Sequence, residues 1–216
     1  MYSYQFFNKQ RITELYEKEE LEGEITEEEM KERMHLWEEG FSSWTKGDFN
    51  SFIKASEKHG RNAIDEIAES LKGKSKEEVT RYHRVFWSRY KELKDGEKIV
   101  SSIEKAEKKL AKNKETNALI EEVLSKFPNS VEDLHFNYGP HYQAKGFSRQ
   151  ADRYILACCR KYGYGNWLRV KQALDKIPQL KFDYFLRTRT PVELSRRAEV
   201  LAKLLQRTHS YSSLYG

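Results

Sequence analysis

The sequence is poor in the residues that break helices or cross-link chains. Its 216 residues include only four Pro, eleven Gly and two Cys. The cysteines, Cys158 and Cys159, are adjacent, a spacing that fits neither a usual disulfide nor a zinc site, so a reducing compartment is expected. The six histidines show no metal-ligand spacing either. We therefore expect no metal and no other cofactor.

Long apolar runs are also absent. No stretch approaches the roughly 18 apolar residues that a membrane span requires, and no signal peptide is present. A soluble, intracellular chain without membrane contact is therefore expected. The mean hydropathy of −0.87 is low for a single globule of this length, but the 13% aromatic content argues against disorder. Helical modules rather than one globule fit both values.

Recognisable catalytic motifs are missing as well. Residues 73–75 (GKS) resemble the end of a phosphate-binding loop, but Ala68 occupies the place of its leading glycine, and KEEV follows instead of an apolar helix. We therefore expect that the chain is not an enzyme.

Two stretches of the chain repeat the same pattern of large apolar residues. Counted from Trp44 and from Phe147, apolar side chains recur at +8, +20 and +23, and a glycine at +16. This spacing predicts two helices that share a core, with the glycine ending the first. The matching residues are Trp44, Phe52, Gly60, Ile64 and Ile67 in the first stretch, and Phe147, Ile155, Gly163, Trp167 and Val170 in the second.

A third helix is predicted after each stretch, so each repeat should form a three-helix unit. One helix begins at Ser75 and the other at Thr190, where Pro191 takes the first helical position that proline favours. The second unit carries an insertion, around PQLKFDYFLR, before its third helix. Upstream, residues 9–20 predict a short helix, and Thr26 with Glu29 forms a capping-box pair that opens another, which ends near residue 40.

One long helix is predicted between the two units, over residues 94–128. Positions spaced by four and three residues from Ile99 to Phe127 form a seam that is apolar at both ends and carries Asn113 and Asn117 in its middle. Such a helix would dock on one unit at each end and cross water between them, over roughly 45–50 Å. A coiled-coil seam, or two helices broken near Asn113, are the alternatives. The expected fold class is all-α and elongated.

Charge is distributed unevenly along the chain. Residues 1–40 carry 5 basic and 12 acidic side chains, a net of −7, whereas residues 145–207 carry 15 and 5, a net of +10. The intervening segments 41–93 and 94–144 have net charges of +3 and −1. This concentration of basic charge at one end predicts an anionic partner there, most simply nucleic acid.

The combined pattern resembles the HAND-SANT-SLIDE module of ISWI-type chromatin remodellers. Three-helix units with these aromatic offsets are typical of the Myb/SANT family, and the resemblance runs over nearly the whole chain. The segments YQFF (4–7), ITEEE (25–29), GFSSWTKGDFNSFIKASEKHGR (40–61) and FWSRYKEL (86–93) match HAND and SANT, and QLKFDYFLRTRTPVELSRR (179–197) matches SLIDE most specifically. HAND usually has four helices, so the one here is abridged, which leaves open whether it contacts DNA.

The resemblance divides the chain into five parts. These are abridged HAND-like helices at 1–40, a SANT-like unit at 41–93, the spacer helix at 94–128, a SLIDE-like unit with an insertion at 129–207 and a tail at 208–216. It implies a nuclear accessory module, cut from a remodelling ATPase whose motor lies upstream. Such a module binds double-stranded linker DNA and nucleosomes, and couples linker length to nucleosome sliding and spacing.

The last predicted helix has one apolar and one basic face. On a wheel of about 100° per residue, Lys203 and Arg207 fall within about 20° of Arg196, opposite Leu194, Ala198, Leu201 and Leu205. A helix that lies along DNA phosphates needs this arrangement. The full set of predicted DNA contacts is Arg149, Arg153, Arg160, Arg187, Arg189, Arg196, Arg197, Lys203 and Arg207.

The corresponding helix of the first unit predicts weak DNA binding at best. Its outward face mixes acids such as Glu77 and Glu92 with Arg81 and Arg84. Neither third helix begins with residues suited to reading base edges, so DNA binding with little sequence preference is expected, and a sequence-specific Myb factor is disfavoured. The alternative function is an interaction scaffold that binds histone tails or an accessory subunit.

Overall fold

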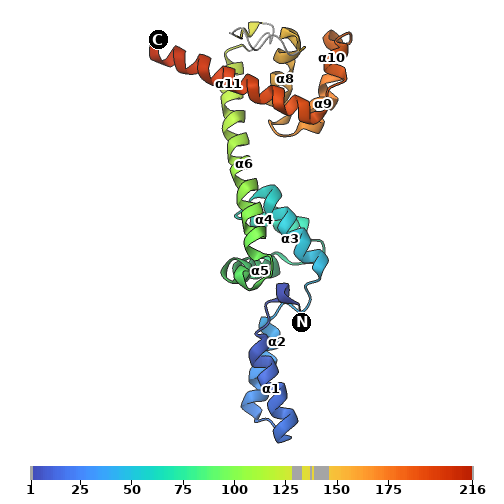
Figure 1. The fold of residues 1–216 in the computed structure, drawn as a ribbon, viewed down its shortest axis with the longest axis vertical. Helices are drawn as coiled ribbons and strands as arrows, with labels where there is room; N and C mark the ends of the chain where they lie inside the picture. Colours follow the sequence, from blue (N-terminus) through green and yellow to red (C-terminus); the bar gives the residue numbers. More distant parts are fainter. Residues whose placement is uncertain (1, 128–132, 137, 139–145, 216) are drawn as a thin grey trace. The chain divides into compact units, whose positions relative to one another are not determined.

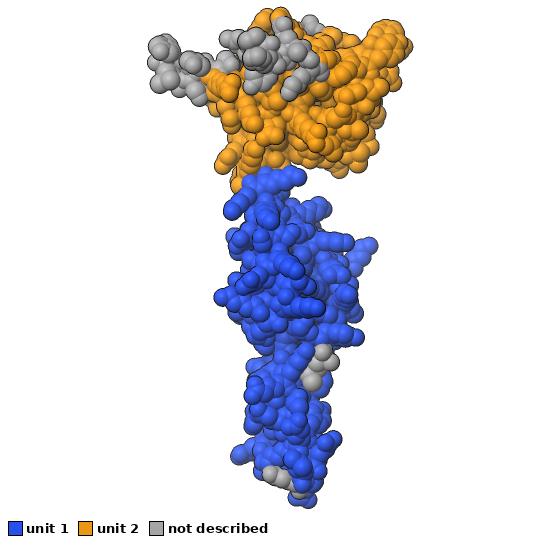
Figure 2. Space-filling model, viewed as in Figure 1, with its two compact units in different colours: residues 1–110 blue, residues 111–216 orange. Residues whose placement is uncertain are grey.

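The computed structural model describes residues 2–127, 133–136, 138 and 146–215, and within these ranges every regular element is helical and none is a strand. The predicted all-α class is confirmed. The chain forms two compact units, residues 1–110 and 111–216 (Figure 2). Most of residues 129–145, which the sequence places at the start of the SLIDE-like unit, lie outside the described ranges. No helix in the described part is long and apolar enough to cross a membrane.

Unit 1 begins with a helical hairpin. A short 3-10 turn, η1 (Ser3–Gln5), precedes α1 (Lys9–Glu22) and α2 (Glu27–Glu39), which lie side by side (Figure 1). The predicted capping box is present. The Thr26 hydroxyl accepts a hydrogen bond from the Glu29 backbone N–H, and the Glu29 carboxylate accepts one from the Thr26 backbone N–H. The hydrogen bond from Lys18 is the main reason that the pKa of Glu29 falls to about 2. Ion pairs therefore join the two helices.

The three-helix part of unit 1 has an aromatic core. It consists of α3 (Lys46–His59), α4 (Ile64–Ser70) and α5 (Lys76–Arg89), followed by the turn η2 (Tyr90–Glu92). Trp44 stacks on Tyr82 with ring centroids 3.4 Å apart, and Phe52 and Phe86 are fully buried beside them. Gly60, at φ 91°, ends α3 as predicted.

Helix α6 (Gly96–Ser125) is continuous, so there is no break near Asn113. Ile103 belongs to the core of unit 1, and Ile120 to the core of unit 2. The prediction that both asparagines cross water is wrong: Asn113 is half-buried, and the Asn117 side chain accepts a hydrogen bond of 2.7 Å from the Tyr164 backbone. The longest uninterrupted run of exposed residues in α6 covers only residues 108–112.

Unit 2 repeats the three-helix pattern. Its main helices are α8 (Arg149–Tyr162), α9 (Trp167–Leu174) and α11 (Pro191–Tyr215), and the predicted insertion forms the short η5 (Pro178–Leu180) and α10 (Tyr184–Arg187). Ile155 and Val170 are fully buried, and Gly163 ends α8 as predicted. Helix α11 continues through most of the expected tail, because neither Gly nor Pro follows Pro191 before residue 216.

Candidate nucleic-acid interface

Helix α11 separates an apolar face from a basic face. Leu194, Ala198 and Leu201 have no exposed surface, and Leu205 is almost as buried. On the other side Arg196, Lys203 and Arg207 are exposed, as the helical wheel predicts. We call these three residues the α11 stripe. The burial of one face fixes the direction of the other, since rotating the helix would expose its leucines.

Among the described residues, the cations of the α11 stripe have few carboxylate partners. No described carboxylate lies within ion-pairing distance of Arg196 or Arg207, and Lys203 is 3.5 Å from Glu199. Glu199 is shared, because its Oε1 also lies 3.1 Å from Lys112 Nζ. Surface pairs of this kind contribute about 0–1 kcal/mol, so Lys203 can exchange Glu199 for a phosphate at little cost.

The N-terminus of α11 is fixed by a capping box. The Thr190 backbone N–H donates a hydrogen bond of 2.8 Å to Glu193 Oε2, and the Glu193 backbone N–H donates one to the Thr190 hydroxyl. The backbone bond from Thr190 is the main reason that the pKa of Glu193 lies below its usual range. The first turn therefore presents an ionised carboxylate rather than donors for base edges.

Arg197 is buried, and the prediction that it contacts DNA is wrong. Only 4% of its surface is exposed, and its Nε donates 2.7 Å to Asp152 Oδ1, while Nη2 binds the second carboxylate oxygen. Asp152 is itself fully buried and also accepts 2.8 Å from the Tyr138 hydroxyl. A buried guanidinium requires a counter-charge. Arg197 therefore joins α11 to α8 inside the unit.

Three further predicted contacts have partners within the chain. Arg160 forms a two-pronged pair with Glu121 on α6, and this bond is the main cause of the lowered pKa of Glu121. The half-buried Arg153 donates 2.8 Å to the Leu134 carbonyl. Arg189 binds Glu193 at 2.6 Å and covers the Phe185 ring. These arginines position elements of unit 2, and of the three Arg189 lines a cavity together with Arg196 of the α11 stripe.

Arg149 and Arg187 are exposed, as a DNA-contacting role requires. Arg149 has its guanidinium 6.0 Å from the centre of the Tyr138 ring, and Arg187 donates 3.1 Å to the Lys181 carbonyl. Sequence reasoning left out Lys161 and Arg169, which are also exposed and have no described carboxylate partner. Their place on the outer sides of α8 and α9, opposite the buried core positions, was the available signal.

The acids of residues 145–207 offset only part of the basic charge of that segment, which has a net charge of +10. All five acidic side chains between residues 145 and 207 already have partners in the chain. Asp152 binds Arg197, Asp175 binds Lys171, Asp183 caps α10, Glu193 caps α11, and Glu199 binds Lys112 and Lys203. The exposed cations that remain produce a positive field of the kind that attracts a polyanion.

The described residues outside this surface include no group placed to form a metal site. No three His, Cys, Asp or Glu side chains in that part of the chain are placed to hold a metal ion. Cys158 and Cys159 are both buried in α8, and burial raises their thiol pKa values to about 11 and about 12. Both behave as small core residues rather than nucleophiles.

Comparisons with known proteins agree with the sequence resemblance. The family model SLIDE matches residues 97–209. A "Probable chromatin-remodeling complex ATPase chain" of Oryza sativa is 39% identical over 226 residues, which cover 96% of this chain and 20% of the relative. An ISWI chromatin-remodeling complex ATPase of Arabidopsis thaliana is 39% identical over 227 residues, with 94% of this chain and 21% of the relative covered. An ISWI chromatin-remodeling complex ATPase of Saccharomyces cerevisiae is 36% identical over 188 residues, with 85% of this chain and 17% of the relative covered. The chain thus spans about a fifth of the length of these relatives.

Proposed function

Since the chain belongs to the SLIDE family and is an ISWI-type SLIDE-containing module, we propose that it serves as a DNA-binding accessory module in nucleosome remodelling. The segment that the relatives share with it is a small part of each, and the proposed role is non-catalytic: the chain holds DNA while a motor elsewhere in the same protein hydrolyses ATP. The proposed place of action is the nucleus, where nucleosomal DNA is found.

The α11 stripe is the observation that carries this proposal. Arg196 and Arg207 are exposed and without carboxylate partners among the described residues, and the apolar side of their helix is fixed in the core. Lysine and arginine at this spacing neutralise phosphates and release counterions, a contribution that does not depend on base sequence. Pro191, Val192 and Glu193 occupy the helix start, where a reader of the major groove would place Arg, Asn or Gln. The proposed DNA binding is therefore largely sequence-independent.

The finer part of the proposal concerns which DNA is bound and to what end. We assign the linker DNA outside the nucleosome to unit 2, and the role of spacer to α6. The continuity of α6 from Gly96 to Ser125 supports a spacer, because a broken helix would not transmit a fixed register. A nucleosome would then be moved according to the length of DNA available to unit 2. Lengthening α6 within its exposed run 108–112 should shift the nucleosome spacing that the full-length ATPase produces.

DNA binding against salt concentration tests the central claim. Engaging roughly four to six phosphates predicts a log–log slope of affinity against salt near −4 to −5. Arg196→Ala combined with Lys203→Ala should reduce the magnitude of that slope by about 2, equally on unrelated duplexes. The matched control is Arg84→Ala with Lys91→Ala, which removes the same charge from exposed positions of unit 1.

The outcomes separate the competing functions. Equal losses from both double variants would mean that net charge alone attracts DNA, without a site on α11. A loss confined to one duplex sequence would favour a sequence-specific factor. Unchanged binding on every duplex would leave the module as a protein-interaction scaffold.

A further inference from the structure

Helix α2 exposes a row of large apolar side chains. Met30, Met34 and Trp37 are 45%, 59% and 36% exposed. Their spacing of four and three residues places them on one face of the helix. The other face of α2 pairs with α1, because Glu29 and Glu32 bind Lys18 and Arg11. Met30 and Met34 therefore lie outside the face that meets α1, while the partly exposed Trp37 also packs edge-on against Phe7, with ring centroids 4.9 Å apart.

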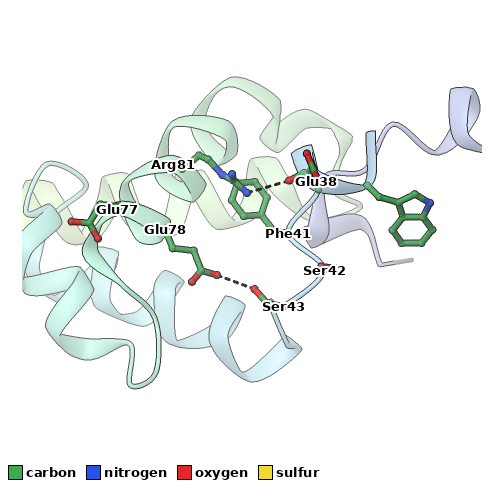
Figure 3. A pocket seen from close by; sticks show the side chains of 9 residues that line it. Glu38, Phe41, Ser42, Ser43, Glu77, Glu78 and Arg81 are labelled. Atoms are coloured by element: carbon green, nitrogen blue, oxygen red, sulfur yellow. Dashed lines mark hydrogen bonds between the residues drawn. The ribbon is translucent and has the colours of Figure 1, made fainter. Parts of the chain in front are cut away.

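The row ends at a cavity of about 590 Å³ in unit 1. Trp37 is among its lining residues. Phe41 provides an apolar wall, and Glu38, Glu77 and Glu78 also line the cavity (Figure 3). A cavity of this size accommodates a large side chain. We call the row Met30–Met34–Trp37 together with this cavity the α2 surface.

The charge of the cavity is net negative. Among the residues that line it, the cation Arg81 is already engaged: its guanidinium lies 4.8 Å from the centre of the Phe41 ring and donates a hydrogen bond of 3.4 Å to the Glu38 carbonyl (Figure 3). Glu78 accepts hydrogen bonds from Ser43 and Trp44 and forms an ion pair of 3.2 Å with Lys74, so Glu38 and Glu77 carry the excess negative charge. Glu77 is exposed, and a backbone hydrogen bond lowers its pKa, so its carboxylate is ionised near neutral pH.

The cavity walls are held in place by the rest of unit 1. The Gln5 side chain donates hydrogen bonds of 3.2 Å to the backbone carbonyls of Ser42 and Trp44. In return, the Phe41 backbone N–H donates a hydrogen bond of 3.0 Å to the Gln5 carbonyl. A methyl group at Gly40 would lie 2.1 Å from the Phe7 ring, so the chain packs closely there. A preformed site of this kind requires little ordering when a ligand binds.

We propose that the α2 surface binds a basic amphipathic helix of a partner protein. Apolar residues of that helix cover Met30, Met34 and Trp37, and one of its Lys or Arg side chains enters the cavity beside Glu77. The sign of the charge selects the partner: residues 1–40 carry a net −7, which repels DNA and favours a cationic protein segment. The proposal is separate from DNA binding by unit 2, since every residue that it uses lies in unit 1.

Three synthetic peptides test the proposal on the intact chain. One is an amphipathic helix of leucine and lysine, one has the same pattern with glutamate in place of lysine, and one is an oligolysine without leucine. Calorimetry or fluorescence anisotropy should show saturable binding of the leucine–lysine helix and of neither other peptide. If oligolysine bound equally well, charge alone would explain the binding. If the leucine–glutamate helix bound equally well, apolar contact alone would explain it. Either result would overturn the proposal.

Paired variants locate the binding. Met30→Ser with Met34→Ser should lower the affinity for the leucine–lysine helix at least about tenfold, because both apolar anchors are lost without a change in charge. Leu21→Ser with Leu110→Ser, at two other exposed apolar positions of unit 1, should leave its affinity unchanged. Glu77→Gln should weaken binding severalfold, whereas Glu69→Gln on the exposed side of α4 should not. Equal effects of a variant and its control would place the peptide elsewhere.

Two further measurements keep the outcomes distinct. Unchanged circular dichroism and thermal midpoints would show that the variants fold, as expected for exposed positions. Sedimentation of the unmodified chain tests the competing occupant, a second copy of the same chain. A dimer that Met30→Ser with Met34→Ser dissociates would overturn the proposal of a basic partner.

Discussion

At the scale of single residues, the buried pair of Arg197 and Asp152 makes the sharpest prediction. Asp152→Ala leaves the Arg197 guanidinium buried without a counter-charge, so it should lower the free energy of unfolding of unit 2 by about 3–5 kcal/mol. Urea denaturation measures this loss. Arg196→Ala, at the exposed neighbour, should change stability by no more than about 0.5 kcal/mol. Similar losses at both positions would contradict the assignment of Arg197 to the interior.

The sequence held a signal for this pair that the helical wheel of α11 did not reveal. Arg197 falls at the border between the apolar and basic faces, so its direction depends on what packs beside it. Asp152 is the informative residue, because it interrupts the apolar face formed by Ala151, Ile155 and Leu156. A carboxylate on a core face requires a cation, but 45 residues separate the partners, and only the tertiary fold identifies which cation is used.

His83 gives a prediction about pH. It is half-buried on α5 with Nε2 2.8 Å from the Arg61 carbonyl, and burial lowers its pKa. The unfolded chain takes up a proton near pH 6.5, whereas the folded one does so only at lower pH. The contribution of His83 to stability is therefore complete above about pH 6.5 and declines below it. Between pH 7 and 5 the unmodified chain should lose more stability than His83→Gln, in urea denaturation followed by Trp fluorescence. Parallel pH profiles would contradict this.

At the scale of elements, α6 is more closely attached to unit 2 than its sequence suggests. Asn117 accepts the hydrogen bond of the Tyr164 backbone, and Thr116 beside it is buried. Asn117→Leu removes the acceptor and leaves a half-buried N–H unpaired, which should cost unit 2 about 1–3 kcal/mol in chemical denaturation. Lys114→Leu, at an exposed position three residues earlier, is the matched control and should be nearly neutral. An equally small effect of both would mean that solvent satisfies Tyr164.

The elements themselves were largely predictable because their ends follow local chemistry. Thr26, Ser75 and Thr190 cap helices where the sequence predicts, and Gly60 and Gly163 end them. Two features were not predictable by such rules. A polar residue such as Asn117 in a helix seam is compatible with water or with a backbone partner, and only tertiary contact decides. The end of α11 lacked a stop signal, so its length could not be read locally.

At the scale of the whole molecule, the two units have separate hydrophobic cores, and α6 contributes to both. Ile103 is fully buried among the aromatic residues of unit 1, and Ile120 is fully buried in unit 2. Replacing a buried isoleucine by alanine costs about 2–5 kcal/mol through lost burial and the cavity that remains. We therefore expect Ile103→Ala to destabilise unit 1 and Ile120→Ala to destabilise unit 2, each without a comparable effect on the other.

The chain carries a natural reporter for each unit. Cys158 and Cys159 are buried in unit 2, so pulsed alkylation in urea detects its unfolding, because buried thiols react only when the unit opens. Trp44 is buried in unit 1, and a variant with the other three tryptophans replaced by phenylalanine would follow that unit by fluorescence. Ile120→Ala should shift the alkylation midpoint to lower urea and leave the Trp44 midpoint in place, while Ile103→Ala does the reverse. Midpoints that move together in both variants would show that the continuous helix joins the units into one cooperative structure, and stability could then no longer be assigned to each core separately.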